Sequence, residues 1–232
     1  MSRRVLPLTV AIALLVIPAL VLRAAETDES KRITAAATAL DEIMGAGDKG
    51  LPKSILDKAE GIAVFPSMLK GGLVVGGEHG RGVISARDKK NGGWSSPAFL
   101  SITGGSFGAQ IGAQAIDLIL VVNNQRGLEQ LVQNQFKVGA DAGVAAGPVG
   151  REASASTDIQ MRAQIFSYSR ARGLFAGATI NGSTIHQDRD ANDRFYGMGY
   201  RTGQIIFEGL AEKPTAPDAV ATWKAALAKY SK

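Results

Sequence analysis

One serine of this chain stands in a motif that is typical of a catalytic nucleophile. Gly104-Gly-Ser106-Phe-Gly108 matches G-x-S-x-G, in which a sharp turn from strand to helix exposes the serine beside an oxyanion hole. Asp117, Asp141 or Asp158, followed by His186, would complete the order serine, acid, histidine. The residues after Ser106 alternate as in a strand and include glycines, which a helix disfavours. We therefore expect a strand here, and a serine hydrolase remains the alternative function.

Two other groups contain side chains that bind metals in many proteins. Asp188-x-Asp190-x-Asn192 begins like a calcium loop, but the turn glycine and the closing glutamate of such loops are both missing. His79 lies next to Glu78 and has no second histidine at ligand spacing. The chain has no cysteine, which excludes disulfides and thiolate metal sites. We expect neither a metal nor a cofactor, and residues 188–192 are interpreted as the charged start of a helix.

Basic residues flank several apolar segments of the chain. A cation beside an apolar surface gives affinity for lipid phosphates at a membrane interface. Each of these residues alone is most simply a solvated surface residue. The candidates for phospholipid binding are Lys53, Lys58, Lys70, Arg81, Arg170 and Arg172.

The first 25 residues have the features of a leader. Arg3 and Arg4 precede the apolar residues 5–22, and two alanines follow shortly afterwards. This order is typical of a secretory signal peptide, with an uncleaved membrane anchor as the alternative. Three of the 26 basic residues and none of the 21 acidic ones lie in this leader, so the remaining chain is nearly balanced in charge. We expect export to the periplasm or cell envelope and no nucleic-acid partner.

Helical periodicity marks both ends of the remaining chain. Apolar residues recur at helical spacing from Ile33 to Met44, and Pro52 opens a short second helix that reaches Ala59. A last helix is predicted after Thr215-x-x-Asp218, which resembles a capping box. Its apolar stripe consists of Val220, Trp223, Leu227 and Tyr230.

Between these helices the apolar residues alternate with a period of two. Residues 107–115 and 136–146 predict half-buried strands, and the change of phase at Asp117 predicts a bulge or a change of element. Further strands are expected at 73–77, 83–86, 99–103, 163–170 and 174–180, and short helices at 126–133 and 188–195. Strands in succession without regular helical crossovers predict a single α+β domain over residues 30–232. Its core would be a glycine-rich, mainly antiparallel β-sheet or partial barrel, flanked by N-terminal and C-terminal helices.

Most of the 28 glycines lie between Gly61 and Gly150. Glycine weakens regular elements, so this density indicates a specific use. Three uses are open: tight turns, close approach of backbone segments, or a surface kept free of side chains for a ligand.

Several long phrases between Gly61 and Gly177 occur in a characteristic order. They include Gly61-Ile-Ala-Val-Phe-Pro66, Gly104-Gly-Ser-Phe-Gly108, Ala145-Ala-Gly-Pro-Val-Gly150 and Gly173-Leu-Phe-Ala-Gly177. With them the chain resembles the SYLF domain family from about residue 33 to residue 197. The resemblance implies binding of anionic phospholipid, actin binding in some yeast relatives, and no known catalytic activity. We expect an exported, non-catalytic phospholipid-binding protein of the cell envelope, with a protein-binding envelope scaffold as a further alternative.

Overall fold

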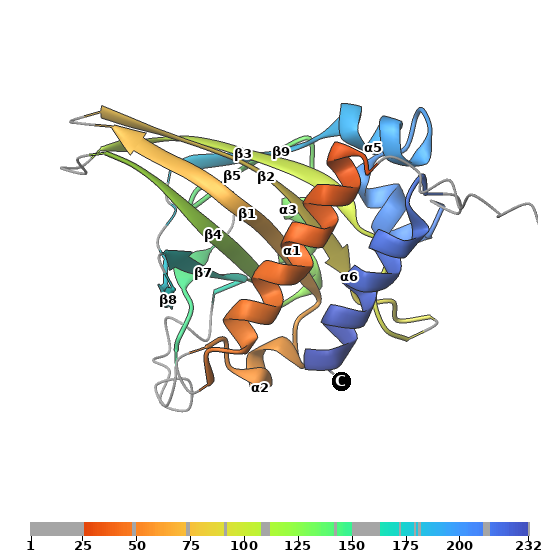
Figure 1. Ribbon diagram of the computed structural model, residues 1–232, viewed down its shortest axis with the longest axis horizontal. Coiled ribbons are helices and arrows are strands. Elements are labelled where there is room, and N and C mark those ends of the chain that lie inside the picture. Colours follow the sequence, from red (N-terminus) through yellow and green to blue (C-terminus); the bar gives the residue numbers. More distant parts are fainter. Residues whose placement is uncertain are drawn as a thin grey trace, which may run out of the picture.

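The strands form one curled sheet in a computed structural model of the chain (Figure 1). The structure describes residues 26–47, 50–72, 75–90, 92–107, 112–141, 143–149, 163–171, 173–178, 180, 182–210 and 214–231. The strands are β1 (Gly61–Gly72), β2 (Val75–Ala86), β3 (Ala98–Phe107), β4 (Gly112–Val122), β5 (Gln135–Lys137), β6 (Val144–Ala146), β7 (Ile165–Ala171), β8 (Leu174–Gly177) and β9 (Ser183–Gln187). The helices are α1 (Asp28–Met44), α2 (Lys53–Leu56), α3 (Gln125–Leu131), α5 (Arg189–Tyr196), the π-helix η3 (Gln204–Glu208) and α6 (Pro217–Tyr230).

The order of strands across the sheet is β5-β9-β3-β2-β1-β4-β7-β6, and β8 pairs with β7. Among the described strands, the pairing is antiparallel except between β6 and β7. The α+β class and the mainly antiparallel sheet with helices from both ends of the chain are therefore confirmed. None of the helices in the described ranges combines the length and the apolar character needed to cross a bilayer. Residues 1–25, where the leader is predicted, lie outside the described residues.

Different helices cover the two faces of the sheet. On the outer face, α1 and α6 lie side by side (Figure 1), and the buried Trp223 of α6 donates its indole N–H to Ser85 Oγ at 2.8 Å. On the inner face lies α3, where a Cβ on Gly61 would come within 2.6 Å of Leu128. With both faces covered, residues 62–65 of the central strand β1 are fully buried. This accounts for the continuous apolar run of β1, which has no alternation and was not predicted as a strand.

The irregularity predicted near Asp117 is present, but it lies in the neighbouring strand. Phe65 of β1 pairs with Leu118 and Met68 pairs with Ile116, so two residues of β1 lie opposite Asp117. Ser67, one of the two, has a positive φ of 49°. Its backbone N–H donates to Asp117 Oδ1 at 2.8 Å, so a carboxylate of β4 holds the bulge of β1 in place.

Close approach of the protein's own groups explains several glycines of the sheet. A Cβ on Gly82 would lie 2.4 Å from the carbonyl oxygen of Val64 and 2.6 Å from the Phe65 ring. A Cβ on Gly147 would lie 2.0 Å from the Tyr168 ring. At these positions the space beside the backbone is filled from within the protein, so it is not a surface kept open for a ligand.

The prediction of one strand over residues 136–146 is wrong. The chain forms β5 and β6 instead, which lie toward opposite edges of the sheet. Gly139 adopts a φ of 85°, and Asp141 Oδ2 accepts the N–H of Lys137 at 2.5 Å, which closes a turn between the two strands. Short strands joined by a turn keep the same alternation as one long strand. The capping box of the last helix is also absent, because α6 begins at Pro217 and its N-cap residue, Ala216, makes no side-chain hydrogen bond.

Candidate functional site

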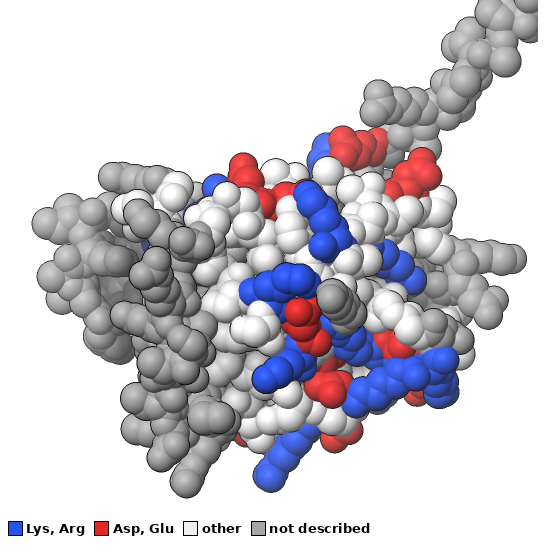
Figure 2. Space-filling model, turned by 90° about the horizontal axis from the view of Figure 1, so that it is seen from below, with Lys and Arg blue, Asp and Glu red and all other residues white. Residues whose placement is uncertain are grey.

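The basic residues predicted to bind phospholipid do not form one cluster. Lys53, at the start of α2, donates to Asp57 Oδ1 at 2.8 Å and to the carbonyl oxygen of Tyr230 at 3.1 Å, whereas Lys58 beyond α2 is exposed. Figure 2 shows this side of the molecule, where basic and acidic side chains stand among one another and form no patch of one sign. Arg172 lies outside the described residues.

Lys70 lies on the inner face and is part of a polar cluster. Its Nζ is 3.1 Å from Glu78 Oε2, and Ser183 Oγ donates to Glu78 Oε1. Glu78 is 7% exposed and Ser183 is 2% exposed. A Cβ on Gly104 would lie 2.9 Å from both Glu78 Oε1 and Ser183 Oγ. The charge of Lys70 is thus used within the protein, in a cluster that has no room for a further group at Gly104.

Arg170 of β7 is also committed to internal ion pairs. Its Nη2 is 2.6 Å from Asp117 Oδ2 and also contacts Glu42 of α1, and its Nε donates to Asp117 at 3.0 Å. The same carboxylate holds the bulge at Ser67. Arg170 therefore fastens α1 to the sheet beside the bulge.

The sixth candidate, Arg81, lines a groove of about 500 Å³ between α1 and the outer face of β1 and β2. We call it the outer groove. Lys31 on α1 and Arg81 on β2 are exposed on its two walls, and neither has an ion-pair partner among the described residues. Leu69 is 58% exposed at the same place, because the bulge turns it away from the core and beyond the cover of α1. The groove therefore combines an exposed apolar side chain with two exposed cations and one exposed acid, Asp28.

Two residues at this groove, Arg32 and Asp188, are held in place by contacts within the protein. Arg32 is buried, with its guanidinium 2.8 Å from Asp188 and 5.2 Å from the centre of the Phe99 ring. Asp188 also caps α5 by accepting the N–H of Ala191. The predicted helix start is confirmed, and within the described ranges no group of three His, Asp or Glu side chains gathers to hold a metal.

Sequence reasoning missed a second basic cleft, of about 360 Å³, at the other end of the sheet. It is lined by Arg87, Lys89, Lys90 and Lys224 together with Asp88 and Glu208. Arg87 lies 4.4 Å from the centre of the Trp94 ring and donates to the carbonyl oxygens of Ala59 and Leu56. Burial lowers the pKa of its guanidinium. The basic residues that follow β2 in the sequence could have indicated this cleft. One of them, Lys89, is however paired with Glu60 at 2.8 Å.

The described residues do not show the geometry that the alternative hydrolase requires. Ser106 lies within β3 and pairs with Gly76 of β2, and the next described element is the strand β4 rather than a helix. His186 pairs with Ser101, five residues along β3 from Ser106, or roughly 17 Å at about 3.3 Å per residue. Of the candidate acids, Asp117 and Asp141 hold the bulge and the turn described above, and Asp158 lies outside the described residues.

Comparison with known proteins gives a consistent result. Residues 103–230 match the model of the Ysc84 family, described as "Las17-binding protein actin regulator". LAS seventeen-binding protein 3 of Saccharomyces cerevisiae is 35% identical over 196 residues, which are 83% of this chain and 42% of the yeast protein. SH3 domain-containing YSC84-like protein 1 of Rattus norvegicus is 33% identical over 172 residues, 74% of this chain and 50% of the rat protein. The chain thus spans half or less of the length of these relatives. The family match, together with the phrases of β1 to β4, shows that the chain belongs to the Ysc84, or SYLF, family.

Proposed function

We propose that this protein is exported to the cell envelope and binds anionic phospholipid through the outer groove without catalysing a reaction. The observation that carries the proposal is the exposure of Leu69 in the groove that Lys31 and Arg81 also line. An apolar side chain that enters the interface and cations that meet the phosphates are the two components of peripheral membrane binding. Lys53, Lys70 and Arg170 of the predicted set contribute less to this proposal, because each is paired with an acid.

Reversing the charge of the groove gives a quantitative test. Each Lys or Arg near an anionic surface contributes about 1 kcal/mol, so reversal changes the binding free energy by about 2 kcal/mol at each position. For Lys31→Glu with Arg81→Glu the expected loss is about 4 kcal/mol, or roughly a thousandfold in affinity. The measurement is cosedimentation with vesicles of phosphatidylglycerol and phosphatidylcholine, with pure phosphatidylcholine as the neutral reference.

A matched control uses the same substitutions at the α2 end of the molecule. Lys53→Glu with Lys58→Glu makes the same change in net charge, and we expect it to weaken binding far less. Equal loss in both double variants would show that only net charge matters and would refute the groove as the site. A further variant, Leu69→Ser, should weaken binding without changing its dependence on salt, since it removes an apolar contact and no charge.

The export part of the proposal is supported by the pattern of residues 1–25 and has its own test. We expect the native protein to fractionate with the envelope and to begin, by intact mass, near residue 26. A protein recovered from the cytoplasm with residues 1–25 still attached would refute export, whatever the result of the vesicle assay.

A protein partner is the second candidate function. It is favoured by the names of the yeast relatives, which describe binding to another protein, Las17. The same vesicle experiment separates the two candidates. Wild-type protein that fails to bind phosphatidylglycerol vesicles, while envelope proteins crosslink to a photoreactive residue at position 69, would favour the protein-binding scaffold.

A further inference from the structure

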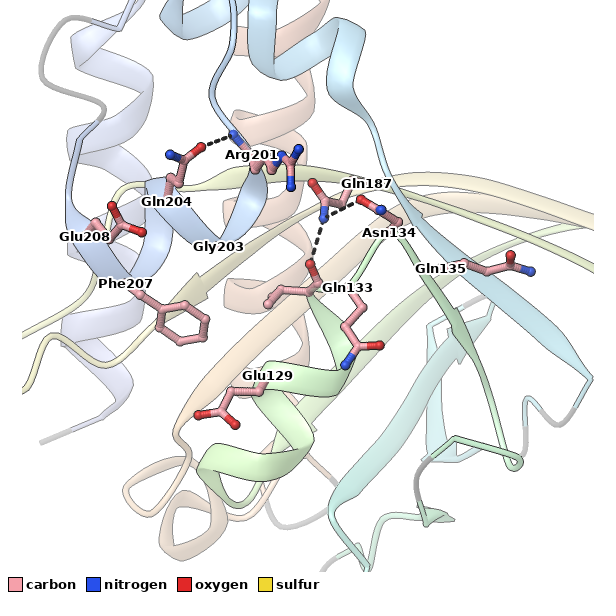
Figure 3. Close-up of a pocket in the computed structure, with 11 residues that line it drawn as sticks. Glu129, Gln133, Asn134, Gln135, Gln187, Arg201, Gly203, Gln204, Phe207 and Glu208 are labelled. Atoms are coloured by element: carbon pink, nitrogen blue, oxygen red, sulfur yellow. Dashed lines mark hydrogen bonds between the residues drawn. The ribbon is translucent and has the colours of Figure 1, made fainter.

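A third cleft, of about 640 Å³, shares none of its described lining residues with the outer groove. It opens between the connection from α3 to β5, the end of β9 and the segment that contains η3 (Figure 3). Its volume is within the range of small-molecule sites, about 300–1,000 Å³. Five of its lining side chains are primary amides: Gln133, Asn134, Gln135, Gln187 and Gln204. We call it the amide cleft.

The back of the amide cleft is held in place by hydrogen bonds. Gln187 donates from Nε2 to the carbonyl oxygen of Val132 at 2.8 Å, and its Oε1 accepts the N–H of Thr202 at 3.2 Å. Gln204 Oε1 accepts the N–H of Arg201 at 3.0 Å. These bonds join the wall formed after α3 to the wall formed by η3, so the amide cleft is preorganised before any ligand enters.

Other groups at the mouth of the amide cleft remain available. Gln133 and Gln135 are exposed, and Figure 3 shows their amide groups standing away from the hydrogen-bonded back wall. Phe207 of η3 is 37% exposed and projects into the same space. A π-helix is rare and occurs often at functional sites. Here it carries an aromatic ring to a cleft that is lined mainly by polar side chains.

The charges around the amide cleft do not suit an anion. Among the described residues, Glu129 and Glu208 line it together with Arg201, and Arg189 donates to Asn134 Oδ1 at 2.6 Å. Acidic and basic side chains are thus balanced, and no surplus of positive charge is present for a phosphate or a carboxylate. A neutral ligand, rich in both donors and acceptors, is therefore favoured.

We propose that the amide cleft binds a neutral saccharide. A primary amide donates and accepts at once, as each hydroxyl group of a sugar does, so several amides in one cleft match several neighbouring hydroxyls. The face of a pyranose ring that carries only C–H groups is apolar and packs on an exposed aromatic ring such as Phe207. Both requirements are met within one cleft of suitable volume.

An extended peptide is the competing ligand, because it also offers donors and acceptors. It would bind most simply by adding to the outer edge of β5. At that edge the backbone of Lys137 is already used: its N–H donates to Asp141 Oδ2, and its carbonyl oxygen accepts the N–H groups of Asp141 and Ala140. Strand addition along β5 is therefore blocked at Lys137.

The test uses saturation-transfer difference NMR and calorimetry on the full protein with two neutral probes, chitotetraose and maltotetraose. We expect at least one to bind, with transfer to ring C–H protons and with affinity that does not change with salt. Phe207→Ala and Gln133→Ala with Gln135→Ala should each lower that affinity at least tenfold. The matched control is Leu210→Ala, which removes an apolar side chain that is 41% exposed just outside the cleft and should leave the affinity unchanged.

Three results would overturn the proposal. The first is that neither probe binds the wild-type protein under conditions in which the protein is folded by circular dichroism. The second is that a probe binds equally well to the Phe207 and glutamine variants, which would place its site elsewhere. The third is that tetra-alanine, used as the peptide probe, binds at these residues while both saccharides do not.

Discussion

Two glycines of β2 provide a sharp test of why this sheet needs so many of them. A Cβ on Gly82 would lie 2.4 Å from the carbonyl oxygen of Val64, whereas the nearest atom to a Cβ on Gly77 is 3.9 Å away. Neither glycine has a positive φ, so backbone strain does not distinguish them. Gly82→Ala overpacks a buried site, which costs about 1–3 kcal/mol, and its clash with a backbone atom places it toward the upper end. Gly77→Ala should instead stabilise the strand by about 0.5–1 kcal/mol, because alanine loses less entropy on folding.

The two variants should therefore differ by at least about 2 kcal/mol in the free energy of unfolding. At about 2–4 °C per kcal/mol for a domain of this size, the melting temperatures should differ by about 4–8 °C or more. Urea unfolding and thermal melts followed by circular dichroism measure both quantities. If Gly82→Ala were as stable as Gly77→Ala, the sheet would have room beside Gly82, and its close approach to Val64 would not explain this glycine.

Three further predictions concern contacts of the terminal helices and of the β1 bulge. Trp223→Phe removes the hydrogen bond to Ser85 and part of the ring volume. The free energy of unfolding, measured by urea titration, should fall by about 1 kcal/mol or more. A fall no larger than that of a surface variant would show that this contact does not stabilise the fold. Asp117→Ala removes the carboxylate that holds the β1 bulge; we expect a loss of about 2 kcal/mol, between the values for surface and buried ion pairs, and an unchanged melting temperature would contradict this. The hydroxyl of Tyr230 and then the ammonium of Lys229 hold the pKa of Asp41 below its usual 3.8. A lowered folded-state pKa stabilises the protein above the unfolded pKa and loses this effect as the pH falls, so Asp41→Asn should melt slightly earlier than wild type at pH 7 and equally at pH 2.

The sequence predicted the helices that have a clear period, whereas the alternating residues 136–146 form two short strands and a turn. The stripe of α6 is buried as expected, with Trp223 and Leu227 fully inaccessible, and the short helices α3 and α5 are present. The central strand β1 was missed, because it is buried on both faces and shows no alternation. The π-helix η3 was also missed, since a single π-turn leaves no period in the sequence.

The candidate sites were less predictable than the fold. Arg81 was identified from the sequence, but its neighbours in the outer groove, Lys31 and Leu69, belong to other elements. Whether a cation is free depends on acids that are distant in the chain, as with Arg170 and Asp117, which are 53 residues apart. The amide cleft likewise collects its side chains from α3, β9 and η3, and no motif in the sequence connects them.

The sequence by itself determined the class of the fold, the family and the glycine-rich sheet, because period, turn residues and long phrases are local properties of the chain. It left open whether the glycines serve turns, close packing or a ligand. That choice depends on which atoms lie opposite each glycine, and only the tertiary structure sets this. At Gly82 and Gly147 it places the carbonyl oxygen of Val64 and the Tyr168 ring there. Close packing within the curled sheet is therefore the physical reason for these glycines, and ligands are left to the grooves at its surface.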